Sequence, residues 1–160
     1  MSERVGIAEL RIAGAPQVLK AYGLGSCLAV ALYDPGLRLG GLVHCLLPQQ
    51  RGTDPVDVSP KYVDAAIRLM IEKLLEAGAD PGRLQAKIAG GANMFESEFI
   101  TLMHSIGVRN ARSARETLLE LGIPLVAEEV GGNRGRTVAF DLATGQLLVY
   151  CAKDDSTLTL

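Results

Sequence analysis

The chain has no excess of basic residues and no long apolar run. Its 16 Lys and Arg residues nearly balance its 18 Asp and Glu residues. A protein that holds a phosphate backbone needs a basic surface, so nucleic acid is not an expected partner. No segment approaches the roughly 18 apolar residues that cross a bilayer, and residues 1–12 contain no apolar stretch of secretory length. We therefore expect a cytoplasmic protein without membrane insertion.

Cysteine and histidine are also scarce. The three cysteines, Cys27, Cys45 and Cys151, are odd in number and too sparse for a disulfide scaffold, so we expect reduced thiols. Together with two histidines they show no zinc-ligand spacing, so no metal site is expected. With 160 residues, 48% of them apolar, the chain is long enough for one domain over residues 1–160 with a core of its own.

Strands should outnumber helices. Apolar patterns and turn signals predict strands at residues 5–12, 17–22, 27–33, 39–46, 84–89, 124–130, 136–142 and 146–151. Helices are predicted from residue 60 to residue 77, with Ser59 as N-cap, and from about residue 110 to residue 121. Because strands cluster at both ends of the chain, we expect an α+β fold: a layered sandwich of mixed, mostly antiparallel strands with two main helices. The last three strands should form a meander.

A glycine-rich segment, Gly-Leu-Gly-Ser-Cys, occupies residues 23–27. It is unlike a dinucleotide-binding loop, because the third glycine is missing and no acidic residue follows roughly 20 positions on. Glycines also allow the backbone to bend tightly around one exposed side chain, which here would be Cys27.

A hairpin would bring a histidine to that cysteine. If Pro35 and Gly36 are the two central residues of a turn, Cys27 pairs directly with His44, with β-carbons roughly 4.5–5.5 Å apart. Pro-Gly favours a type II turn, however, whereas two-residue hairpins prefer primed turns, and one extra loop residue would set Cys27 against Cys45. Both registers remain open at this point.

The segment at residues 23–27, followed by Gly-Leu-Val-His at residues 41–44, resembles the CheD family of chemoreceptor glutamine deamidases. Further blocks that resemble the family follow in order at residues 61–66, 87–95, 106–110 and 127–136. The resemblance implies an α/β sandwich related to deamidating toxins. It also implies hydrolysis of receptor glutamine amides without a cofactor, with methyl-accepting chemotaxis receptors and a CheC-type phosphatase as partners.

The resemblance further implies that Cys27 is the nucleophile and His44 the base. The family's third catalytic member is a threonine, and this chain has Ala21 in its place. Loss of this hydroxyl should lower the rate unless a backbone carbonyl or another hydroxyl orients the imidazole in its place, and Ser26 is a candidate. Tyr22 should point to the opposite face of its strand.

Backbone N–H groups around Gly25 are expected to hold the oxyanion, and Asn93 is a further candidate for that role or for substrate binding. Cys45 and Cys151 are expected to be packing residues. The stretch at residues 97–105 departs from the family by its length and contains His104. Two functions stay open: an active deamidase with a thioester intermediate, or a regulatory binding module that lost most activity through Ala21.

Overall fold

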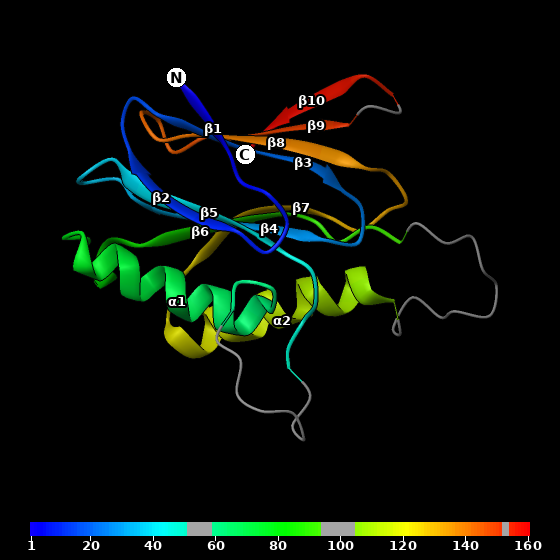
Figure 1. Ribbon diagram of the computed structural model, residues 1–160, viewed down its shortest axis with the longest axis horizontal. Helices are drawn as coiled ribbons and strands as arrows, with labels where there is room; N and C mark the ends of the chain where they lie inside the picture. Colours follow the sequence, from blue (N-terminus) through cyan, green and yellow to red (C-terminus); the bar gives the residue numbers. More distant parts are fainter. Residues whose placement is uncertain (51–58, 94–104, 152–153) are drawn as a thin grey trace.

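Three stacked layers make up the computed structural model, which describes residues 1–50, 59–93, 105–151 and 154–160 (Figure 1). Two five-stranded sheets form two layers, and a pair of helices forms the third. Both sheets are mixed: each has one parallel strand pair, and the other pairs are antiparallel. The predicted α+β sandwich is confirmed.

Sheet A has the strand order β1-β3-β8-β9-β10. Its strands are β1 (Ser2–Arg4), β3 (Val18–Leu24), β8 (Arg136–Asp141), β9 (Leu147–Cys151) and β10 (Ser156–Thr159). Buried residues on its inner face, among them Leu19, Val138 and Phe140, form one hydrophobic cluster together with the facing residues of sheet B.

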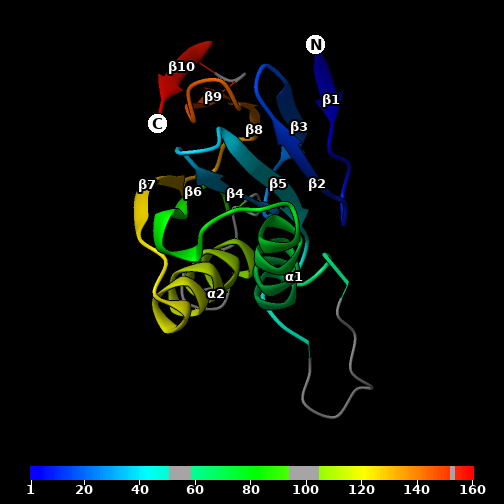
Figure 2. The ribbon, with the colours of Figure 1, turned by 90° about the vertical axis from the view of Figure 1, so that its left-hand side faces the viewer.

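Sheet B has the strand order β2-β5-β4-β6-β7. Its strands are β2 (Leu10–Gly14), β5 (Leu39–Cys45), β4 (Leu28–Asp34), β6 (Gln85–Gly90) and β7 (Leu125–Val130). Every residue of β4 is buried, because this central strand has sheet A on one side and the helices on the other (Figure 2). Burial on both faces explains why its sequence is an unbroken apolar run.

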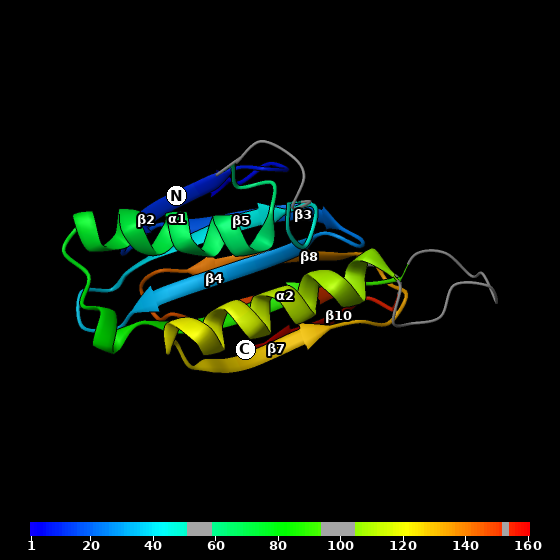
Figure 3. The same ribbon diagram turned by 90° about the horizontal axis from the view of Figure 1, so that it is seen from below.

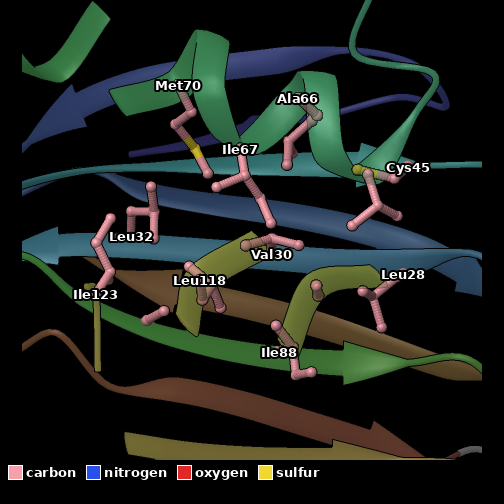
Figure 4. Close-up of a cluster of buried hydrophobic side chains, with 14 of the residues drawn as sticks. Leu28, Val30, Leu32, Cys45, Ala66, Ile67, Met70, Ile88, Leu118 and Ile123 are labelled. Carbon is pink, nitrogen blue, oxygen red and sulfur yellow. The ribbon is translucent and has the colours of Figure 1, made fainter. Parts of the chain in front are cut away.

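The helices α1 (Val63–Glu76) and α2 (Ile106–Leu121) lie side by side against sheet B (Figure 3). A short 3₁₀ turn, η1 (Pro81–Arg83), connects α1 to β6. Ile67 and Met70 of α1 and Leu118 of α2 pack onto Val30 and other apolar residues of sheet B (Figure 4). Among the described residues, no helix is long and apolar enough to cross a membrane.

The helix ends differ from their predicted positions. α2 begins earlier than predicted, where the Ser105 hydroxyl accepts a hydrogen bond from the Val108 N–H at 3.2 Å. It ends as predicted at Gly122, whose φ is 72°. Ser59 is not the N-cap of α1: its hydroxyl accepts from the Lys61 N–H at 3.1 Å within a local turn, and Tyr62 occupies the cap position.

Two predictions about connectivity are wrong. Residues 5–12 do not form one strand, because a turn closed by the Gly6 N–H and the Glu9 carboxylate (2.7 Å) separates β1 in sheet A from β2 in sheet B. The last three predicted strands are not a meander, since β7 pairs with β6 and only β8 and β9 form a hairpin. Gly131 and Gly132, with φ of 86° and 68°, carry the chain from one sheet to the other.

A buried carboxylate lies at the end of β4. Asp34 accepts hydrogen bonds from Arg83 Nε (2.7 Å) and Nη2 (2.9 Å) and from the backbone N–H groups of Gly36 and Asp80 (both 2.9 Å). The Arg83 guanidinium is the main cause that holds the pKa of Asp34 well below its usual range. This network ties the β4–β5 turn to η1.

Candidate functional site

The β4–β5 hairpin sets the relation between the candidate nucleophile and base. Ala29, not Cys27, lies opposite His44, and Leu28 lies opposite Cys45. Both predicted registers are therefore wrong, because the loop at residues 35–38 is longer than a two-residue turn and Arg38 adopts a φ of 49°.

Relative to the predicted register with Cys27 opposite His44, the shift spans two residues, so it leaves the faces of the strands unchanged. Cys27 precedes Ala29 by two positions and belongs to the same inter-sheet cluster as Ala29 and Leu42. His44 lies on that face as well, as the partner of Ala29 and two residues beyond Leu42. Cys27 and His44 are thus diagonal neighbours, whose α-carbons are typically about 7–8 Å apart.

Both residues are buried between the sheets. Cys27 is 7% exposed and His44 is 1% exposed. Across from them, β3 contributes Ala21 and Leu24, both fully buried. Cys45 points the other way, into the cluster under α1 (Figure 4). The hairpin therefore places one thiol with the imidazole and the other in the core.

Hydrogen bonds hold the loop that precedes β4. The carbonyl of Gly25 accepts from the Ala92 N–H at 2.9 Å, and the carbonyl of Cys27 accepts from the Gly91 N–H at 2.8 Å. The carbonyl of Ser26 accepts from Asn110 Nδ2 at 2.8 Å. As the glycine-rich segment predicts, the bend starts with a positive φ of 68° at Gly23. The candidate nucleophile Cys27 thus lies on a loop held by hydrogen bonds.

Burial makes both groups neutral at neutral pH. It lowers the pKa of His44, and the positive charge of Arg4 adds to this effect, while the nearby Val5 backbone partly opposes it. Burial raises the pKa of Cys27, an effect that its own backbone N–H partly opposes. Among the described residues, neither ring nitrogen of His44 has a hydrogen-bond partner. The resting pair is a thiol and a neutral imidazole that are not hydrogen-bonded to each other.

At the position of the family's threonine, Ala21 is fully buried on the inner face of β3, whereas Tyr22 points outward and is 46% exposed, as predicted. The Ser26 hydroxyl forms no hydrogen bond with the imidazole. Val5 runs beside Ala21, since its N–H donates to the Lys20 carbonyl at 2.7 Å. The Val5 backbone, which affects the pKa of His44, therefore lies beside the position of the family's threonine.

The remaining candidates are Asn93 and the stretch at residues 97–105. The Asn93 N–H donates to the Gly132 carbonyl at 2.8 Å, which ties the end of the β6 segment to the β7–β8 connection. Residues 97–104 lie outside the described residues, and Ser105 is the N-cap of α2. No three His, Cys, Asp or Glu side chains in the described part of the chain converge as metal ligands would.

A cavity of about 560 Å³ opens at the same end of the sandwich as Cys27. Glu129, Arg134, Arg136 and Cys151 are among its lining residues. Arg136 links it to the Cys27 loop, because its Nη1 donates to the carbonyl of Gly90 at 3.1 Å and Gly90 lies beside Leu28.

Sequence reasoning missed Asn110, which contacts the candidate nucleophile loop from α2. It lay within a block that resembled the family, but no role was assigned to it. The available signal was its residue type: asparagine is a poor helix former, so an asparagine inside an amphipathic helix suggests a side-chain hydrogen bond.

Comparison with known proteins gives a consistent picture. The family described as "CheD chemotactic sensory transduction" matches residues 46–151. A Geobacter metallireducens protein, "Probable chemoreceptor glutamine deamidase CheD 2", is 49% identical over 146 residues, which cover 91% of this chain and 90% of that protein. "Probable chemoreceptor glutamine deamidase CheD" of Moorella thermoacetica is 49% identical over 148 residues, covering 91% and 88%. The protein of the same name from Desulforamulus reducens is 44% identical over 146 residues, covering 91% and 88%.

Among solved structures, the Bacillus licheniformis hypothetical protein YfiH is similar over 75% of this chain and 49% of that one, with a TM-score of 0.48 and 15% identity. So distant a likeness carries no functional information.

Proposed function

This chain belongs to the CheD family, and from that premise we propose that it hydrolyses glutamine side-chain amides on chemotaxis receptors to glutamates. The relatives that match nearly its whole length carry the name chemoreceptor glutamine deamidase. The observation that supports a cysteine mechanism is the placement of Cys27 and His44 on one face of the β4–β5 hairpin, next to a loop fixed by hydrogen bonds.

In the proposed first half-reaction the neutral imidazole of His44 takes the Cys27 thiol proton as Sγ attacks the carbonyl carbon of the glutamine amide. Backbone N–H groups of the loop at residues 25–27 hold the oxyanion of the tetrahedral intermediate. The imidazolium then returns its proton to the departing nitrogen. Ammonia leaves, and a thioester joins Cys27 to the receptor side chain.

In the second half-reaction His44 is neutral again and takes a proton from water, whose oxygen attacks the thioester carbonyl. The intermediate collapses with release of the Cys27 sulfur, which recovers its proton from His44. The product is a glutamate on the receptor. One base therefore serves both steps, and the overall change is the replacement of an amide nitrogen by a water oxygen.

Ala21 supports a second candidate function, a regulatory binding module with little or no activity. The inner face of β3 carries a methyl group where the family has a hydroxyl, and the ring nitrogens of His44 lack partners among the described residues. Without an acceptor for one ring N–H, neither the orientation of the imidazole nor the nitrogen that carries the proton is fixed.

Ammonia release separates the two functions. A purified cytoplasmic receptor fragment is incubated with the protein, ammonia is measured, and receptor peptides are analysed for conversion of glutamine to glutamate. Matched release of ammonia and formation of glutamate supports the deamidase. Binding of the fragment without either product supports the regulatory module.

We further propose a cytoplasmic location and a CheC-type phosphatase as partner. Family membership supports both. A helical segment of the phosphatase would bind at or beside the Cys27 loop and compete with the receptor. Fluorescence titration of the protein with labelled receptor fragment, repeated with increasing phosphatase, should show displacement. A ternary complex without mutual weakening would contradict competition.

A further inference from the structure

Asn110 joins the nucleophile loop to the end of the histidine strand. Its side-chain amide donates to the carbonyl of Ser26 at 2.8 Å and to the carbonyl of Leu46 at 3.2 Å. Ser26 immediately precedes Cys27, and Leu46 comes two residues after His44. The side chain lies in α2 and is fully buried.

Close packing of two backbones makes this contact feasible. A β-carbon on Gly107, in the first turn of α2, would lie 2.5 Å from the carbonyl oxygen of Gly91. A β-carbon on Gly91 would likewise lie 2.8 Å from the carbonyl oxygen of Gly107. The start of α2 therefore rests directly on the segment that follows β6, and Asn110, one helical turn on, reaches the loop at residues 25–27.

The hydrogen bond to Ser26 determines the direction of the next N–H group. In a trans peptide the carbonyl of Ser26 and the N–H of Cys27 point in opposite directions. The carbonyl points toward the helix layer, where Asn110 holds it. The Cys27 side chain lies on the other side of sheet B, in the inter-sheet cluster. The Cys27 N–H thus points to the side of its own sulfur and of His44.

Two further observations agree with this direction. The backbone N–H of Cys27 lowers the pKa of its own thiol, against the larger effect of burial. No hydrogen bond from the Cys27 N–H to another described residue is present, whereas the carbonyls of Gly25, Ser26 and Cys27 all have partners. Among the described residues the Cys27 N–H therefore has no acceptor, and it lies beside the sulfur that would attack the substrate carbonyl, where an oxyanion would form.

We propose, on the basis of the proposed deamidase function, that Asn110 is the positioning residue that aims the Cys27 N–H at the oxyanion. Its residue type fits this role. The carboxamide supplies two N–H donors to two carbonyls, and Oδ1 has no partner among the described residues. A carboxylate in its place would set negative charge against two carbonyl oxygens, and a methyl group would leave both without a donor.

The test compares amide hydrolysis with alkylation of the same thiol, because alkylation by iodoacetamide develops no oxyanion on the loop. Asn110→Ala should lower kcat for receptor deamidation on the order of tenfold to a hundredfold, with KM and the rate of Cys27 alkylation changed less than about twofold. Ser113→Ala is the matched control: its hydroxyl donates from α2 to the Pro48 carbonyl at 2.7 Å, one turn from Asn110. This variant should keep the wild-type kcat.

Asn110→Ser, which keeps a polar group, repeats the test should the alanine variant not fold, and thermal unfolding of each variant controls for stability. Parallel loss of hydrolysis and alkylation would overturn the proposal, since Asn110 would then support the loop as a whole. Unchanged kcat would overturn it as well, and so would failure of both variants to fold. Wild-type protein that releases no ammonia would instead contradict the deamidase function itself.

Discussion

At the residue scale, the pKa shifts of His44 and Cys27 determine the protonation state of the pair before substrate binds. Burial lowers the pKa of His44 and raises that of Cys27, so each group favours its neutral form. Burial is the main cause that acts on the pKa of the Cys27 thiol, and it disfavours a preformed thiolate. Proton transfer from sulfur to imidazole is therefore expected to accompany attack on the substrate.

The lowered pKa of His44 predicts the acid limb of the pH profile. Proton transfer requires neutral imidazole, and a group with a lowered pKa stays neutral to lower pH than free histidine, whose pKa is about 6.5. The value of kcat/KM should therefore be flat between pH 8 and pH 7 and fall only at a pH below about 6.5. Stopped assays of ammonia release across this range check the limb. A fall that begins above pH 7 would contradict a neutral, buried base.

The position of the missing threonine allows a second test. Ala21→Thr should raise turnover on the order of tenfold, or about 1.4 kcal/mol of barrier, because its hydroxyl would orient the imidazole. Ala21→Val is the control, since valine has the same shape without the hydroxyl. Steady-state rates of both variants are compared with wild type. An equal change in both would assign the effect to packing, and no change in either would mean that the Val5 backbone already orients His44.

Cys27 and His44 were predicted from the sequence because their surrounding blocks resemble a family, but the predicted direct pairing between them is wrong, and their diagonal relation was not predicted. A turn of unknown length separates the two strands, and each added loop residue shifts the register. Asn110 was missed for another reason. It lies far from Ser26 in the sequence, and only the docking of α2 brings them together.

At the scale of elements, an error of two residues in strand register does not change which face of the sheet a side chain lies on. The observed hairpin differs by two residues from the predicted register with Cys27 opposite His44, so the same side chains face sheet A in both. The alternative register with Cys27 opposite Cys45 differs by one residue and would have placed them on the other face. The turn at residues 6–9 and the change of sheet at residues 131–132 could not be predicted in the same way. They depend on which sheet a short strand joins, and strand patterns alone carry no such information.

The turn at the end of β4 provides an element-scale test of stability. Arg83→Ala removes the partner of the fully buried Asp34 and leaves its carboxylate with only backbone donors. We expect a lower urea midpoint and unchanged kcat, since Asp34 and Cys27 lie at opposite ends of β4. Arg115→Ala is the control, because that arginine also contacts a carboxylate through two nitrogens, on the exposed Glu128. A fall in midpoint no larger than in the control would contradict the role of burial.

At the scale of the whole molecule, the layers place the three thiols in different environments. Cys27 lies between the sheets beside His44, and Cys45 lies under the helices, where burial raises its pKa much further. Cys151 is half-buried at the end of β9, in the wall of the neighbouring cavity. Cys45 and Cys151 therefore serve as controls for Cys27, since a general effect of losing a thiol would appear at all three positions.

Ammonia release by the three single variants Cys27→Ala, Cys45→Ala and Cys151→Ala tests the central claim most directly. Each variant is incubated with the same receptor fragment, and its fold is checked by circular dichroism. The proposed mechanism predicts that Cys27→Ala releases no ammonia above background while remaining folded, and that the other two variants retain activity. Equal loss in all three, or full activity without the Cys27 thiol, would contradict it.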